Sequence, residues 1–236
     1  MRPFLIVLFA CVAIQVKGQN VFIQPEFGFG SGNAHIKDYH GAPLLSTSSV
    51  TTYHYQVSVG KTLGHLVWGT GLSLLRTGFE HTVSYVPDPF SGAVPYGKYN
   101  WYFYHLTLPL YAGYTFSAGK RIRVTPAIGP EIAYNLGGSV QQPGEQTTNH
   151  VDDFTANHNT LSIFGMARIN VAFRLNKQLS IVLAPEALYM LTNFYATPGN
   201  IEGSATQRNY AYLFNAGIKW RPVRKADIRK NVKAGK

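Results

Sequence analysis

Apolar residues alternate with polar or small residues in eight stretches of this chain, most fully at residues 101–116 (WYFYHLTLPLYAGYTF). Every even-numbered residue in that stretch is tyrosine, leucine, alanine or phenylalanine. A period of two predicts a β-strand with one apolar face. Aromatic rings with a polar group settle at the two interfaces of a bilayer. Tyrosines that flank leucines are therefore typical of a strand that crosses a membrane.

Seven more stretches alternate in the same way, which predicts an all-β chain. The eight predicted strands are residues 21–29, 52–60, 66–75, 101–116, 121–136, 161–175, 179–191 and 209–220. Three connections are short, at 61–65, 117–120 and 176–178, and four are long and polar, at 30–51, 76–100, 137–160 and 192–208. Short turns at one end and long loops at the other predict an eight-stranded antiparallel up-and-down transmembrane β-barrel. Prolines within the first, fifth and seventh strands predict bulges or bends there, because proline removes a ladder donor.

The charged residues indicate which side of this barrel is the interior. The eight apolar faces contain no Asp, Glu, Lys, Arg or His, whereas the opposite faces combine small residues with a few ionisable ones. A soluble exterior is roughly 25–35% charged, so a soluble lipocalin-like barrel or a sandwich is the weaker alternative. We therefore predict a membrane barrel with a narrow polar lumen. The inward ionisable residues are Glu26, His54, His105, Arg123, Glu131, Arg168, Arg174, Glu186 and Lys219.

The two ends of the chain differ from the barrel. Residues 1–18 predict a secretory signal peptide, because Arg2 precedes an apolar run that is too short to span a bilayer as a helix. A lipoprotein box at Cys11 is the alternative. Cys11 is the only cysteine, so a mature chain would have no thiol for a disulfide or a metal site. The barrel is then residues 19–220, and both of its termini are predicted to be periplasmic.

Residues 221–236 form a basic tail. They contain seven Lys or Arg residues and one acid, Asp227, and so contribute +6 of the formal net charge of +10. Such a tail is usually a solvated chain end. The alternatives are binding to anionic lipid headgroups and docking on another envelope protein. Nucleic acid is an implausible partner behind a secretory signal.

Five segments of the predicted strands carry a resemblance to a known family: PE at 25–26, GTGLSLL at 69–75, YHLTLPLYAGYTF at 104–116, PAIGPEIAYNLG at 126–137 and AGIKW at 216–220. In these segments the chain resembles the small outer-membrane β-barrel proteins common in Bacteroidota, which share the broad architecture of the barrel of outer-membrane protein A. The resemblance implies a bacterial outer-membrane location, with membrane lipids and lipopolysaccharide as neighbours, and it leaves the function open. Such barrels usually stop at an aromatic residue. Here Trp220 fits that position but sixteen residues follow it. The resemblance covers nearly all of residues 19–220.

The inward charges predict a polar network inside the lumen. A charge in a narrow lumen needs a partner or water, and three Pro-Glu pairs place Glu26, Glu131 and Glu186 on the inner face. We predict that these carboxylates pair with Arg168, and that His54 or His105 contacts them. The network would plug and stiffen the barrel. The alternative is a gated path for protons or solutes.

Enzymatic activity is a remote alternative. Some eight-stranded outer-membrane barrels modify lipid A, and this chemistry needs a Ser-His-acid set near the outer rim. No motif in the sequence has such a spacing, and no cofactor is predicted. We expect a non-enzymatic structural or surface-interaction protein, with a narrow channel or a subunit of a transport or secretion assembly as the runner-up. The histidines of the predicted outer loops are His35, His40, His81, His150 and His158, and His150 and His158 with Asp152 and Asp153 are the residues weighed for a weak metal site.

Overall fold

The computed structural model describes residues 20–37, 43, 46–83, 97–141, 149–150, 159–194 and 206–222. The predicted signal peptide and nearly all of the basic tail lie outside these residues. Three short strands accompany the barrel: β2 (Thr47–Ser48), β6 (Phe116–Ala118) and β8 (Asn149–His150). The eight long strands are β1 (Val21–Lys37), β3 (Val50–Leu63), β4 (Leu66–Val83), β5 (Gly97–Tyr114), β7 (Ile122–Gln141), β9 (Leu161–Arg174), β10 (Leu179–Met190) and β11 (Thr206–Trp220).

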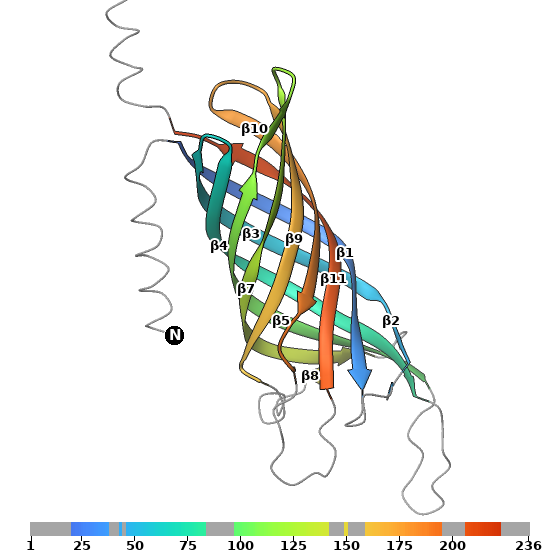
Figure 1. Cartoon of the computed structure of the whole chain (residues 1–236). Helices are drawn as coiled ribbons and strands as arrows, with labels where there is room; N and C mark the ends of the chain where they lie inside the picture. The colour runs from blue at the N-terminus through green and yellow to red at the C-terminus, as the bar shows by residue number, and fades with distance from the viewer. Residues whose placement is uncertain are drawn as a thin grey trace, which may run out of the picture.

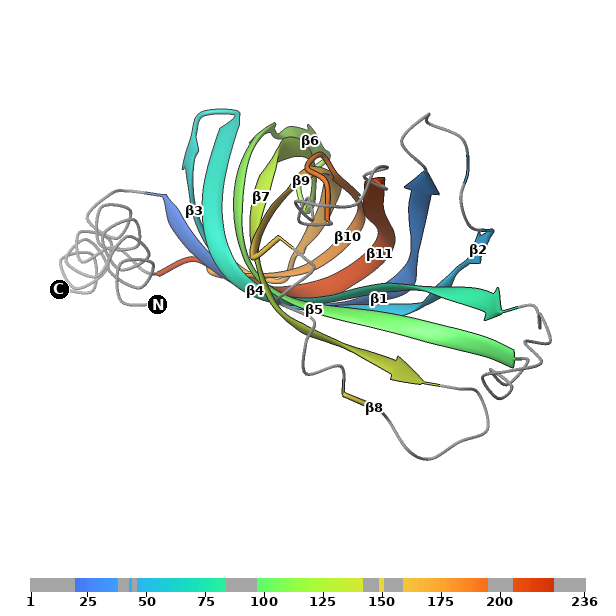
Figure 2. The same ribbon diagram turned by 90° about the horizontal axis from the view of Figure 1, so that it is seen from below.

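The eight long strands close into an antiparallel barrel, as the sequence predicts. Each pairs with its neighbours in chain order, β1 pairs with β11, and the pairing of β4 with β5 completes the ring. Figure 1 shows that β1 begins and β11 ends at the same end of the barrel. We call this the short-turn end. The view in Figure 2 shows the wall curving round on itself, with the ends of β4, β5 and β7 projecting from it.

β1, β4, β5 and β7 extend beyond the predicted ranges at the end opposite the short turns, whereas β9 and β10 do not. β1, β4 and β7 have 17, 18 and 20 residues, whereas crossing a bilayer takes roughly 9–11. The sequence prediction ended each strand where the apolar alternation ends. Alternation marks only the lipid-crossing part, and the hydrogen-bond ladder continues beyond it. The predicted long loops are correspondingly shorter.

These extensions change the position of two histidines and add charge to the outer face. His35 lies on β1, where it stacks on Tyr210 with ring centroids 4.8 Å apart. His81 lies on β4 and hydrogen-bonds to the Ser46 carbonyl at 3.1 Å. Neither therefore lies in a loop as predicted. The outer face, which is free of charge in the predicted ranges, carries an ion pair in the extension, Lys98 Nζ to Glu80 Oε1 at 3.2 Å.

The sequence predicts bulges or bends at the prolines, and the register excludes the bulges, because each proline interrupts a ladder without shifting it. Pro25 pairs with Val57 on β3, but the β1–β11 ladder has no pair at Pro25 and resumes in the same register. Pro185 behaves alike, pairing with β11 and leaving a gap toward β9. Proline lacks only one hydrogen-bond donor. The ladder with the second neighbouring strand stays intact and keeps the register.

A register shift does occur between β5 and β7, but away from the prolines. Tyr104 pairs with Gly137 and His105 with Asn135, so Leu136 is an extra residue in β7. Gly137 has a φ of +144°, a conformation that only glycine adopts readily. The bulge divides the lipid-crossing part of β7 from its extension.

Candidate functional site

The outside of the barrel is apolar on all sides. Exposed large hydrophobic residues occur on each of the eight long strands, and Ile128 on β7 is 70% exposed. Aromatic residues lie toward both ends of the outer face. Tyr114 and Phe116 are at the short-turn end, and Tyr53 and Tyr55 are toward the other. An aqueous exterior does not tolerate so large an apolar surface, so this wall is built to face lipid.

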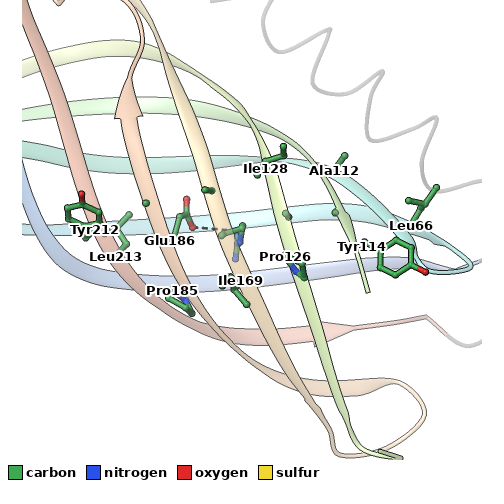
Figure 3. A pocket seen from close by; sticks show the side chains of 15 residues that line it. Leu66, Ala112, Tyr114, Pro126, Ile128, Ile169, Pro185, Glu186, Tyr212 and Leu213 are labelled. Carbon is green, nitrogen blue, oxygen red and sulfur yellow. Dashed lines mark ion pairs between the residues drawn. The ribbon is translucent and has the colours of Figure 1, made fainter. Parts of the chain in front are cut away.

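One part of this outer wall is hollowed. The hollow has a volume of about 800 Å³ and lies along a cross-strand row in which three alanines lie among bulkier residues. Figure 3 shows Glu186 and its ion pair beside the hollow, and the inward register of Glu186 places that pair on the lumen side of the wall. The apolar lining makes this a place where acyl chains can lie. The row is Ala112, Ile128, Ala167, Ala187 and Tyr212.

Arg168 lies at the centre of the lumen and joins two of the predicted carboxylates. Its Nη2 donates to both oxygens of Glu26 at 2.7 and 2.8 Å. Its Nη1 lies 3.6 Å from Glu186 Oε2, and Asn215 donates to the same oxygen at 2.7 Å. Arg168, Glu26 and Glu186 are all buried. We call these residues with Gln56, which accepts from Nη1 at 3.3 Å, the Arg168 layer.

The third predicted carboxylate, Glu131, lies in a separate layer with His54. His54 Nε2 is 3.9 Å from Glu131 Oε1, and both side chains are fully buried. Thr107 and Ser73 donate to the same carboxylate oxygen. Sequence reasoning missed these two hydroxyls, because inward Ser and Thr are common in any barrel lumen. We call this group the Glu131 layer.

His105 belongs to neither layer. It hydrogen-bonds to Thr77 at 2.9 Å and to Asn135. His105 is two residues from Thr107 on the inner face of β5, and Thr107 donates to Glu131. Among the described residues, however, the histidine that contacts a carboxylate is His54, and the partners of His105 are Thr77 and Asn135.

An aromatic layer lies in the lumen beyond His105. Phe164 and Phe194 lie edge-on to the His105 ring, with centroid distances of 5.6 and 6.1 Å. Phe103 packs on Phe194 at 4.8 Å and on Phe79 at 5.9 Å. Phe194 follows β10, in a segment predicted as loop, and is held there by backbone bonds to Asn159 and Gln207. No sequence signal shows that this loop residue turns inward.

The described side chains form consecutive layers across the lumen. Within the described ranges, no set of three or more His, Cys, Asp or Glu side chains is arranged to hold a metal ion. The candidate metal residues Asp152, Asp153 and His158, the side chain of His150, and His40 lie outside those ranges. In the described part of the chain, no helix is long and apolar enough to cross a membrane.

A closed antiparallel barrel with a polar interior and an apolar exterior defines a transmembrane β-barrel. No family model matches the chain, and no curated protein does. Its fold is similar to those of several solved outer-membrane barrels. A major outer-membrane protein of Thermus thermophilus is 15% identical, with 86% of this chain and 99% of that one covered and a TM-score of 0.44.

Two further solved structures have a similar relation to the chain. Neisserial surface protein A is 14% identical over 86% of this chain and 98% of its own, with a TM-score of 0.43. The outer-membrane protein OprG of Pseudomonas aeruginosa is 15% identical over 85% of this chain and 95% of its own, with a TM-score of 0.41. These likenesses are too distant to transfer a function, so we infer function from the residues of this chain.

Proposed function

We propose that the protein is an integral barrel of the bacterial outer membrane, without enzymatic activity, whose closed lumen suits a structural or surface-interaction role. The even number of antiparallel strands and the apolar wall support the outer-membrane location. The predicted location of both termini in the periplasm belongs to this proposal.

The observation that carries the closed lumen is the pairing of Arg168 with Glu26. These residues come from β9 and β1, which are separated by two strands on one side and four on the other. Their two hydrogen bonds, at 2.7 and 2.8 Å, therefore bridge the lumen. A buried, bidentate ion pair is costly to break, and the aromatic layer around Phe103 and Phe194 lies beyond it.

Single-channel recording in planar bilayers tests this proposal. We expect the wild-type barrel to be silent, because an ion would have to displace the Arg168 layer and the aromatic layer in turn. Insertion is verified independently by the mobility of unheated protein in SDS gels. Steady openings of the folded wild-type protein would contradict the proposal.

A narrow conducting path is the second candidate, and one observation favours it. Both ring nitrogens of His54, Glu131 Oε2 and Glu186 Oε1 are buried without a hydrogen-bond partner from the described residues. Such atoms require water, so a hydrated file through the lumen is chemically reasonable. Openings that disappear after His54→Phe, with folding retained, would support this second candidate.

The absence of enzymatic activity and the choice of partner have their own tests. Lipid A mass spectra with and without the protein should be identical.

Affinity purification from outer membranes should identify any envelope partner of the loops. Deletion of residues 223–236 should leave this partner set unchanged if the basic tail is only a solvated end.

A further inference from the structure

A group of cations faces into the mouth of the barrel at the short-turn end. Arg174 on β9 is opposite Ser180 on β10, and Ser180 is opposite Lys219 on β11. These three inward positions therefore form one row, with Arg174 and Lys219 about 10 Å apart at the backbone. The long side chains of both can reach the space between them.

Two more arginines complete the group. Arg123 on β7 is opposite Ala172, two residues from Arg174 on the same face of β9, a diagonal spacing of roughly 7–8 Å. Arg221 follows the last residue of β11, and its N–H donates to the Gln178 carbonyl at 2.7 Å, beside the β9–β10 turn. We call Arg123, Arg174, Lys219 and Arg221 the cationic mouth.

The cationic mouth has no carboxylate of its own among the described residues. The inward acid nearest in register is Glu26, which is two residues from Gln24, the position opposite Lys219. Both oxygens of Glu26 are already bonded to Arg168. Glu26 is therefore already paired with Arg168, and a single carboxylate does not balance the four cations of the mouth.

Lys219 is the most unusual member, because its amino group is buried against an aromatic ring. It is 8% exposed, and its Nζ lies 3.6 Å from the centroid of the Phe22 ring. The ring stabilises a cation from one face only.

The charges of the mouth also act on Arg221. Burial, and then the charges of Arg123 and Arg174, lower the pKa of Arg221 to about 10. The like charges of the mouth disfavour one another's charged forms, and a bound anion would favour them.

We propose that the cationic mouth is a binding site for a phosphate group. Guanidinium groups bind phosphate oxygens in pairs through a planar fork, and several forks around one tetrahedral anion satisfy most of its acceptors. The site is accessible from the short-turn end, because Arg123, Arg174 and Arg221 are partly exposed. Lys219 is buried and lies deeper in the barrel. The phosphate group belongs either to free inorganic phosphate or to the headgroup of a lipid at the rim.

Calorimetric titration of the folded protein with inorganic phosphate tests the site. The full mature chain is used in a non-ionic detergent without phosphate, at an ionic strength held constant with chloride. We expect saturable binding. Arg174→Gln and Lys219→Met should each weaken binding at least about tenfold, since each removes a charge-assisted hydrogen bond. Lys219→Arg should retain it.

Lys177→Gln is the matched control, because Lys177 is an exposed cation on the neighbouring β9–β10 turn. It should bind phosphate like the wild type. The same loss in Lys177→Gln as in Arg174→Gln would indicate general electrostatic attraction and overturn the proposal. So would the absence of phosphate binding, or binding that none of the mouth variants weakens.

A second arm distinguishes the two sources of phosphate. The titration is repeated in nanodiscs of phosphatidylglycerol and in nanodiscs of an uncharged galactolipid. Equal phosphate affinity in both supports free phosphate as the ligand. Weaker affinity only in phosphatidylglycerol supports a lipid headgroup that competes for the mouth.

Discussion

Arg168 has three inward glutamates within its part of the barrel but binds only two of them. The three Pro-Glu pairs look equivalent in the sequence. In the structure, Glu26 accepts two hydrogen bonds from Arg168 and Glu186 lies 3.6 Å away. Glu131 instead lies with His54, Ser73 and Thr107. The parity of a strand predicts which residues face inward, but not which of them share a layer.

Removal of the Arg168 guanidinium should destabilise the barrel strongly. We expect Arg168→Ala to lower the free energy of unfolding by about 3–5 kcal/mol, because it leaves Glu26 and Glu186 buried without their cation. Thermal unfolding in detergent measures this. The control Lys177→Ala, on an exposed turn, should change little. A melting temperature for Arg168→Ala that matches the control would refute this role for the pair.

At the scale of elements, β7 combines two backbone irregularities of different kinds. Pro130 interrupts its ladder with β5 while keeping register, whereas Leu136 is an extra residue that shifts register. The sequence shows where a proline occurs. Whether a strand accommodates it depends on the neighbouring strand that still pairs with it, which for Pro130 is β9. The bulge depends on Gly137 and on how β5 and β7 align, which no local pattern in either strand encodes.

Gly137 provides a test of that bulge. A Cβ built on Gly137 meets no atom within 4 Å, and its φ is +144°. Gly137→Ala should therefore cost about 1–3 kcal/mol through backbone strain alone. Gly165→Ala is the control, because its Cβ makes only ordinary contacts, the nearest at 3.5 Å, and φ there is not positive. Equal urea stability of the two variants would contradict the strain.

At the scale of the whole molecule, the wall reverses the polarity of a soluble protein. Buried polar residues such as Gln24, Thr52 and Asn215 point inward, while large apolar residues of all eight strands are exposed. A lipid solvent accounts for both features, because apolar side chains then face lipid on the outside while polar side chains face one another in the lumen.

Introducing a charge on the outer wall should show whether that position faces lipid or water. Ile128 is 70% exposed and lies six residues after Ile122, the start of β7, which places it near the bilayer midplane. We expect Ile128→Arg to cost about 2–4 kcal/mol for folding into lipid vesicles. Thr82→Arg, in the exposed extension of β4, should stay within about 0.5 kcal/mol of the wild type. Similar values for both would contradict a lipid-facing wall at Ile128.

The sequence alone determined the number of strands, their order, the short turns and the face that each strand turns outward. The strands and their faces follow from the period of two, which is a local property of the sequence. The choice of the outer face follows from the charged residues counted over all eight strands. The positions of Glu26, His54, Glu131, Arg168 and Glu186 on the inner face follow in the same way.

Only the tertiary structure decided which inward residues meet. The partners of His105, the inward turn of Phe194 and the position of Arg174 and Lys219 in one row depend on register between strands that are distant in sequence. It also decided how far the strands extend, because a ladder needs only a hydrogen-bonding neighbour and not an apolar face. Register and closure are properties of the complete barrel, and the sequence of a single strand does not determine them.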